Sequence, residues 1–265
     1  MQQMRMVKMK AIIISISSDI GAALAKRWQK RGYEITGTYR TPNKNIDKLN
    51  ANLISCDLSD DESVMWATDE LKRIGNNWDI LAMCPGTQEP VGLFQDHNFE
   101  DWAESITINF TNQMRILHAL LPSRGKNAKV LLFAGGSMNR ATKYYSAYTA
   151  SKVALVRMTE LLALEIPDTA FTIVGPGWVK TKIHDSTLKA KERAGQDYKR
   201  TVEQLASDRC TPMDKVLDCC DWILSQPKEV IGGRNISVVA DEWGTEKLSH
   251  SLRESKNKFK MRRVE

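Results

Sequence analysis

A tyrosine and a lysine lie four residues apart in the segment Y-T-A-S-K, as Tyr148 and Lys152. On a helix, this spacing places both side chains on one face. A free tyrosine has a pKa of about 10 and is a poor base at neutral pH, but a nearby ammonium favours the phenolate and lowers that pKa. The pair therefore indicates proton transfer at the tyrosine oxygen. Such pairs also occur by chance on many helices, so the position in the chain must decide.

Short apolar runs alternate with amphipathic segments along the chain. Residues 11–16 form a continuous apolar run, typical of a strand buried on both faces of a parallel sheet. Further strands are expected at residues 33–39, 52–55, 79–83, 129–133, 170–174 and 235–240, and helices at 20–31, 61–74, 99–121 and 146–166. This repetition predicts an α/β fold with a doubly wound, parallel, seven-stranded sheet and helices on both faces.

The chain between these strands and helices shows no sign of a domain boundary. No linker, internal repeat or low-complexity tract interrupts them, so residues 1–252 are expected to form one domain. Residues 182–209 depart from the alternation of strands and helices, because they form a long, polar and charged stretch after a strand. Substrate lids are commonly found at such positions.

Charge is concentrated at the two ends of the chain. The formal net charge is +6, and residues 1–10 and 253–265 carry all of it, which leaves the body near neutral. A nucleic-acid protein more often has a basic face within its fold. We therefore expect solvated basic ends, with residues 253–265 as a C-terminal tail, and no nucleic-acid partner.

Composition excludes several classes of protein. Hydrophobic residues make up 42% and charged residues 26%, as in a globular rather than a disordered protein. No apolar run approaches the roughly 20 residues of a membrane span, so no membrane partner is expected. The five cysteines form no C-x-x-C pair. Neither a disulfide scaffold nor a metal site is expected, and a reducing, cytoplasmic location is.

The turn after the first strand is where a doubly wound sheet binds phosphate. It reads S-I-S-S-D-I-G, in which only Gly21 keeps the usual glycine pattern. Asp19 would help the helix as its N-cap but repel a pyrophosphate, so a turn without ligand is a fair alternative. The candidate cofactor contacts here are Ser15, Ser17, Ser18, Ile20 and Gly21.

The end of the second strand distinguishes the two nicotinamide cofactors. An acid there would bind ribose hydroxyls, but Tyr39 takes its place and Arg40 follows. An arginine pairs with a 2′-phosphate, which favours NADP(H) and leaves NAD(H) possible; a solvated loop arginine is the alternative. Asp57, after the third strand, is either an adenine neighbour or the N-cap of the next helix.

Taken in order, these motifs resemble the short-chain dehydrogenase/reductase family, of the single-domain type with a degenerate glycine motif. The resemblance covers roughly residues 8–243. Its marks are the turn before Gly21, Asp57, C-P-G ending at Gly86, Asn109, Y-T-A-S-K, and P-G-W-V-K-T from Pro176 to Thr181. It implies that the sheet is of the Rossmann type and that the helices around Asn109 and Lys152 pack across a two-fold interface.

The resemblance also implies roles for single residues. Tyr148 would be the acid/base, Lys152 its pKa-lowering partner and a ribose ligand, and Asn109 the holder of a proton-relay water. Gly86 would lie beside the cofactor. The loop after the sixth strand would wrap the nicotinamide through Pro176, Gly177, Val179 and Thr181.

The chain departs from this family at the loop after the fifth strand. The family places a catalytic serine there, where it hydrogen-bonds the reacting carbonyl. Here Ala134 and Gly135 take the expected places. Ser137, a position or two later, is the nearest serine and the candidate for the catalytic role, if the loop rearranges to bring its hydroxyl to the site. Loss of such a donor costs on the order of 3 kcal/mol of transition-state stabilisation. Cys84 and Pro85 also replace the family's usual residues before Gly86.

The sequence as a whole predicts an NADP(H)-dependent carbonyl reductase or alcohol dehydrogenase. A small-molecule carbonyl or alcohol substrate would bind between residues 135–141, Trp178 and the lid, and the protein would be a homodimer or homotetramer. His184 is expected to be solvated. The alternative is a dinucleotide-binding or regulatory protein of the same fold with little or no turnover.

Overall fold

Seven parallel strands form one sheet in a computed structural model that describes residues 8–136 and 141–262. The strand order is β3-β2-β1-β4-β5-β6-β7. The strands are β1 (Lys10–Ile14), β2 (Glu34–Tyr39), β3 (Asn52–Ser55), β4 (Trp78–Met83), β5 (Arg124–Phe133), β6 (Ala170–Gly175) and β7 (Arg234–Ser237). The order reverses between β1 and β4, which are hydrogen-bonded neighbours. The predicted doubly wound parallel sheet is therefore confirmed.

Both faces of the sheet are buried, which explains the continuous apolar run in β1. Successive side chains of a strand point to opposite faces. Ile13 accordingly packs in one core with Leu24, while Ile12 and Ile14 pack in the other core. A strand that faces two cores cannot alternate with polar residues.

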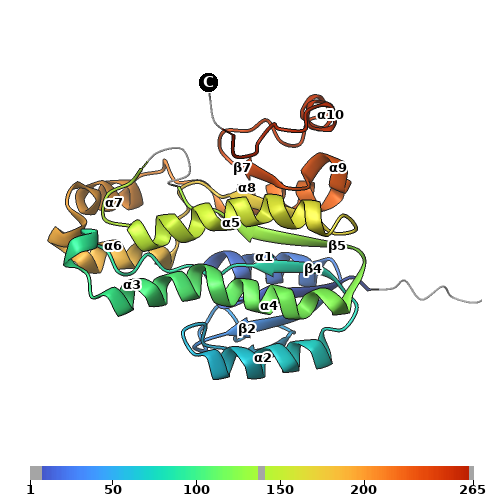
Figure 1. The fold of residues 1–265 in the computed structure, drawn as a ribbon, viewed down its shortest axis with the longest axis horizontal. Coiled ribbons are helices and arrows are strands. Elements are labelled where there is room, and N and C mark those ends of the chain that lie inside the picture. Colours follow the sequence, from blue (N-terminus) through green and yellow to red (C-terminus); the bar gives the residue numbers. More distant parts are fainter. Residues whose placement is uncertain (1–7, 137–140, 263–265) are drawn as a thin grey trace, which may run out of the picture.

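Helices cover both faces of the sheet (Figure 1). One layer holds α2 (Asp61–Ile74), α3 (Phe99–Ile106), α4 (Asn112–Leu120) and α5 (Ser146–Glu165). The other holds α1 (Asp19–Lys30), α8 (Met213–Ser225), α9 (Lys228–Ile231) and α10 (Glu246–Glu254). The short helical turn η1 (Phe94–Asp96) lies between β4 and α3, and η3 (Leu121–Ser123) lies between α4 and β5. No described helix is long and apolar enough to cross a membrane.

The helix expected at residues 99–121 is interrupted by a wider turn, η2 (Thr107–Thr111), between α3 and α4. In a π-type turn, each carbonyl accepts a hydrogen bond from the N–H five residues later instead of four. The Gln113 side chain compensates, because its Nε2 donates to the carbonyls of Asn109 (2.8 Å) and Ile108 (3.3 Å). A single buried glutamine thus stabilises the interruption.

The predicted lid, residues 182–209, is helical for most of its length. It consists of η4 (Lys182–His184), α6 (Asp185–Ala190), η5 (Lys191–Ala194) and α7 (Gln196–Ala206). Figure 1 shows α6 and α7 beyond the end of the sheet toward which the strands point. Lys191 and Gly195 both have positive φ and form the corners between these short helices.

The chain after α10 differs from the expected solvated tail. Residues 255–262 return to the sheet, where the buried guanidinium of Arg234 on β7 donates to the carbonyls of Leu252, Ser255 and Lys258. The Asn235 N–H donates to the Phe259 carbonyl at 2.9 Å. This segment therefore covers the edge of β7.

Glu160 on α5 holds the end of the same segment. Its buried carboxylate accepts the Met261 N–H at 2.6 Å and pairs with Arg262 at 2.8 Å and with Arg157 at 2.9 Å. The basic residues at this end are thus partly used within the fold, because a buried carboxylate needs cationic partners.

A chain that ends at Ser255 tests this attachment. It removes four groups that Arg234, Asn235 and Glu160 bind: the carbonyls of Lys258 and Phe259, the Met261 N–H and the Arg262 guanidinium. We therefore expect the free energy of unfolding to fall by about 2–5 kcal/mol. Chemical denaturation measures the change. Lys256→Ala, at an exposed position of the same segment, is the control for charge. Equal stability of the shortened chain and the full chain would show that the segment is a solvated tail.

Candidate active site

Lys152 lies in the second turn of α5 with its ammonium buried between two strand ends. Its Nζ donates to the carbonyl of Phe133, at the end of β5, at 3.0 Å. It also donates to the carbonyl of Pro85, just after β4, at 3.2 Å. Burial lowers the pKa of Lys152 to about 8 because the charged form loses its hydration. The ammonium thereby joins the loops that follow β4 and β5.

Tyr148, one turn earlier on α5, is also buried. The Lys152 Nζ lies 5.8 Å from the centre of its ring. Burial raises the pKa of Tyr148 to about 12. The expected lowering of this pKa by the lysine is therefore not found in this structure, because desolvation dominates and the ammonium is bound by two carbonyls.

Gly135 lies directly against the Tyr148 ring. A Cβ at position 135 would lie 2.9 Å from the tyrosine oxygen and 2.8 Å from the ring carbon Cε1. The absence of a side chain here is therefore what lets the ring occupy its place. Ser137, the serine nearest to this loop in sequence, lies outside the described residues.

Asn109 fixes the loop after β4 from within η2. Its Oδ1 accepts the Thr87 N–H at 2.9 Å, and its Nδ2 donates to the Thr87 carbonyl at 2.9 Å and to Ser105 Oγ at 3.2 Å. Its own carbonyl accepts from Gln113. The polar groups of Asn109 thus position the backbone beside Gly86, and its role with a relay water stays a prediction.

Sequence reasoning missed Gln113. A signal was present in the sequence, because this uncharged polar residue follows Asn109 by four positions and is followed by the apolar Ile116, Leu117 and Leu120. A fully buried glutamine needs partners for its amide, and the interrupted turn supplies them for the Nε2 group.

The turn after β1 keeps a glycine-like backbone without the glycines. Ser15 has φ of 59°, in the left-handed region that favours glycine. Gly21 is required, since a Cβ there would lie 2.5 Å from the Ser15 carbonyl oxygen. Ser18 caps α1, with its Oγ accepting the Gly21 N–H at 3.1 Å. The expectation that Asp19 is the N-cap is wrong, because Asp19 is the first helical residue.

Ile16 and Gly37 form a pair that sequence reasoning also missed. Ile16 is fully buried in the turn after β1. A Cβ on Gly37, in β2, would lie 2.7 Å from the Ile16 Cβ. The larger side chain in the turn therefore depends on the missing side chain in the neighbouring strand.

Asparagines from the loop after β2 reach the same turn. The Nδ2 atoms of Asn43 and Asn45 donate to the Ser17 carbonyl at 3.1 and 3.4 Å. Ile20 follows on α1, half-buried against the core. These contacts hold the turn close to the loop that begins with Arg40.

Arg40 and Asp57 follow β2 and β3, which are paired neighbours. Arg40 is exposed. The Asp57 carboxylate accepts from the Ser59 N–H at 3.0 Å and the Ser59 hydroxyl at 2.8 Å. Asp60, not Asp57, is the N-cap of α2. The Asp57 carboxylate is therefore held by its own loop, and its place beside an adenine stays a prediction.

The loop after β6 carries Pro176 and a sharp turn at Gly177. Gly177 has φ of 75°, and a Cβ there would lie 2.5 Å from Thr211 Oγ1. Thr181 ends the loop, and its hydroxyl lies 3.5 Å from the Val179 carbonyl. The backbone geometry thus demands glycine at position 177 for two separate reasons.

His184 is buried, so the expectation of a solvated histidine is wrong. Its ring stacks on Trp178 with centroids 3.7 Å apart, and its Nε2–H donates to the Val179 carbonyl at 2.9 Å. Burial lowers the pKa of His184. The stacked pair fixes the loop that leads into the lid.

The lid packs on the catalytic tyrosine candidate. Ala190 and Ala194 form a small apolar cluster with Tyr145 and Tyr148. Tyr145 and Thr187 are hydrogen-bonded through their hydroxyls at 2.9 Å. The Thr187 hydroxyl also donates to Gln88 Oε1 at 3.1 Å. The lid is therefore closed over Tyr148.

Gly86 and Lys152 border a narrow space at the same edge of the sheet. A Cβ at Gly86 would lie 3.9 Å from the Lys152 Nζ and 3.4 Å from Ile183 Cδ1. Glycine at position 86 therefore keeps any side chain away from the ammonium, which is itself buried.

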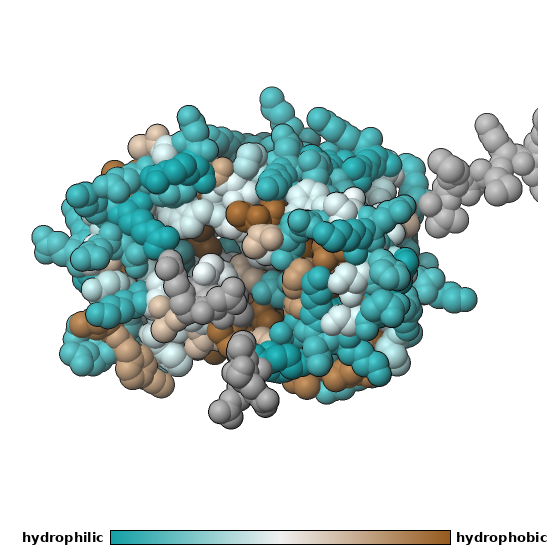
Figure 2. Space-filling view, turned by 90° about the horizontal axis from the view of Figure 1, so that it is seen from above, coloured by the Kyte–Doolittle hydropathy of each residue, from teal (hydrophilic) through white to brown (hydrophobic). Residues whose placement is uncertain are grey.

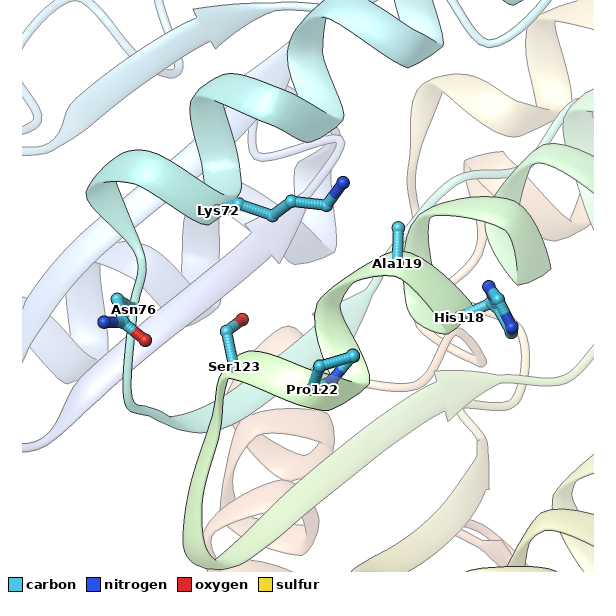
Figure 3. A pocket seen from close by; sticks show the side chains of 6 residues that line it. All are labelled: Lys72, Asn76, His118, Ala119, Pro122 and Ser123. Atoms are coloured by element: carbon cyan, nitrogen blue, oxygen red, sulfur yellow. The ribbon is translucent and has the colours of Figure 1, made fainter.

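Other surface features lie away from these residues. Figure 2 shows a mainly hydrophilic surface with a hollow near its centre and hydrophobic side chains around it. A cavity of about 520 Å³ lies at the opposite edge of the sheet, before β4 and β5 (Figure 3), lined by Lys72, Asn76, His118, Ala119, Pro122 and Ser123. It lacks an acid/base pair like Tyr148 and Lys152. Within residues 8–136 and 141–262, no cluster of His, Cys, Asp and Glu could hold a metal ion.

Comparisons with known proteins agree with this arrangement. The family model described as enoyl-(acyl carrier protein) reductase matches residues 15–240. The 3-oxoacyl-[acyl-carrier-protein] reductase FabG of Buchnera aphidicola subsp. Acyrthosiphon pisum is 25% identical over 89% of this chain and 97% of its own length. The 11-beta-hydroxysteroid dehydrogenase-like 3 of Arabidopsis thaliana is 30% identical over 71% of this chain and 63% of its own length.

Solved structures show the same fold at low identity. The aldohexose dehydrogenase of Thermoplasma acidophilum has a TM-score of 0.75 and 17% identity over 87% of this chain and 92% of its own. An actinorhodin polyketide ketoreductase, solved with NADPH, has a TM-score of 0.73 and 18% identity over 87% of this chain and 95% of its own. With the family model spanning most of its length, the chain belongs to the short-chain dehydrogenase/reductase family of oxidoreductases.

Proposed function

We propose that this protein transfers a hydride between NADP(H) and a small carbonyl or alcohol substrate, with Tyr148 as the acid/base. The observation that carries the proposal is the burial of Tyr148 and Lys152 together on α5, beside the strand ends where this fold binds ligands. Catalytic groups are commonly found where burial shifts the pKa of neighbouring residues.

The residues at this edge fit a nicotinamide dinucleotide. Gly86 leaves open the space beside the Lys152 ammonium, where a ribose hydroxyl would bind. Gly21 allows the turn after β1 to approach α1 closely, as a diphosphate site requires. Pro176 to Thr181, after β6, would contact the nicotinamide. Hydride chemistry comes from the cofactor when it is bound.

Tyr148 would act at the substrate oxygen. Its pKa of about 12 keeps the phenol protonated at neutral pH, which suits proton donation to a carbonyl during reduction. The Lys152 ammonium has three N–H donors. Two of them meet the carbonyls of Pro85 and Phe133, which leaves one to orient the ribose and to return the proton. Asn109 positions the loop beside them and would hold the relay water.

The end of β2 supports a preference for NADP(H). Tyr39 stands where an acid would bind the ribose hydroxyls, and the exposed Arg40 is available to a 2′-phosphate. Asp57, after β3, would lie near the adenine. NAD(H) remains an alternative, because Arg40 does not prevent an adenosine ribose without the 2′-phosphate from binding.

The assembly and location of the protein are proposed on the same grounds. Leu161 and Leu164 leave apolar surface exposed on α5, which suits a homodimer or homotetramer. A cytoplasmic location fits the free cysteines. Arg262, one of the basic residues near the C-terminal end, pairs with Glu160 within the fold, and we propose no nucleic-acid partner.

A regulatory protein of the same fold with little turnover is the second candidate. The closed lid favours it, since only 8% of the Tyr148 surface is exposed. The glycine at position 135 also provides no side-chain donor for a substrate carbonyl. Turnover measurements separate the two candidates.

Tyr148→Phe tests the acid/base role. We expect NADPH oxidation with a panel of small ketones and aldehydes to slow by a factor of about 10² or more, because a proton donor is removed. Tyr33→Phe, at a tyrosine packed against Trp28, is the control and should keep activity. Equal rates for wild type and Tyr148→Phe across the panel would refute the enzymatic proposal.

Arg40→Ala tests the cofactor preference. Loss of a charge-assisted contact to the 2′-phosphate should weaken NADPH binding by a factor of about 10 to 100 and leave NADH binding unchanged. Fluorescence titration with both cofactors measures this. Lys48→Ala, an exposed residue of the same loop, controls for net charge. Equal losses for both cofactors would contradict the assignment.

Lys152→Met tests the buried ammonium through the pH dependence of stability. The folded-state pKa of about 8 lies below the ordinary value of 10.5, so the unfolded chain binds more protons between these values. Stability of the wild type should therefore rise with pH in this window. Relative to Lys152→Met, the free energy of unfolding should increase by about 2 kcal/mol from pH 7.5 to 9.5. A constant difference between the two proteins would show that this pKa is not lowered.

A further inference from the structure

Asp19, the first residue of α1, is bound to two distant segments of the chain. Its Oδ2 accepts the main-chain N–H of Lys182, where the lid begins, at 2.7 Å. Its Oδ1 accepts from Asn45 Nδ2, in the loop after β2, at 3.1 Å. One carboxylate therefore joins the turn after β1, the loop after β2 and the start of the lid.

These three segments border the path of the proposed cofactor. The diphosphate would lie at the amino end of α1, the adenosine near Arg40, and the nicotinamide along residues 176–181. The Asp19 carboxylate accepts hydrogen bonds from Asn45 on one side of this path and from Lys182 on the other. It also places a negative charge where the helix dipole favours an anion.

We propose that Asp19 is an intramolecular competitor of the cofactor diphosphate and sets the affinity of the site for it. The inference rests on the proposed function. A phosphate of the cofactor would bind at the same helix end and to the same Lys182 N–H. The Asp19 carboxylate and the phosphate would then lie close together and repel each other. Cofactor binding therefore requires that Asp19 release Lys182.

Release of Lys182 would also act on the lid. Lys182 is the first residue of η4, and α6 comes next in the chain. Ala190 of α6 packs in the cluster that covers Tyr148. The bond between Asp19 and Lys182 anchors the start of this segment in the closed position. Displacement of the carboxylate by the cofactor thus couples cofactor binding to exposure of the tyrosine, because both states compete for one set of donors.

Asp19→Asn tests the competition with little change in shape. The amide removes the charge, so we expect the dissociation constant for NADPH to fall at least tenfold, and Asp19→Gly should have a similar effect. Asp47→Asn, at an exposed aspartate two residues beyond Asn45, makes the same change in net charge and should leave the affinity unchanged. Calorimetric titration of NADPH measures all four proteins.

The outcomes separate this inference from the proposed function. If NADPH binds the wild type and Asp19→Asn equally well, or if Asp47→Asn tightens binding to the same extent, the competition is overturned and the proposed cofactor stands. If NADPH binds none of the proteins, both the proposed cofactor and the competition fail.

Hydrogen exchange tests the bond itself without cofactor. The Lys182 amide should exchange at least tenfold faster in Asp19→Ala than in the wild type, because it loses its acceptor. The exchange rate in Asp47→Ala should match that of the wild type. Equal protection of Lys182 in Asp19→Ala would overturn the proposed anchoring of the lid.

Discussion

The buried ammonium of Lys152 is the contact on which the rest of the site depends. A charge removed from water is costly unless hydrogen bonds replace its hydration. The carbonyls of Phe133 and Pro85 provide that replacement, so the ends of β4 and β5 must stay close to α5. This requirement places the loop with Gly86, the loop with Gly135 and the tyrosine of the same helix around one point.

The other loops at this edge are held in a similar way, by side chains that bind main-chain groups. Asn109 binds both backbone groups of Thr87, and His184 binds the Val179 carbonyl. Because main-chain partners are independent of the side chain at their position, the loop sequences can change while the loops stay in place. This explains how the chain keeps the family's fold although its turn after β1 retains only Gly21 of the usual glycine pattern.

The repeating elements were predictable because hydrophobic periodicity is set by the two cores. The order of the motifs also placed Tyr148 and Lys152 correctly on one helix. The interruption of the helix expected at residues 99–121 was not predictable from periodicity, since it depends on Gln113 binding two carbonyls. The burial of His184 and the return of residues 255–262 were missed for a related reason. His184 binds the Val179 carbonyl, and Arg234 binds the carbonyls of Ser255 and Lys258. In both cases one of the two partners is a backbone group, which has no sequence signature.

Gly135 has a consequence for how this site could change over evolutionary time. The Tyr148 ring fills the volume in which a side chain at position 135 would begin. A single substitution that restored a serine hydroxyl there would displace the ring that it should assist. The two arrangements are therefore separated by intermediates with a disturbed tyrosine, and a return to the family's usual pattern requires coordinated changes at both positions.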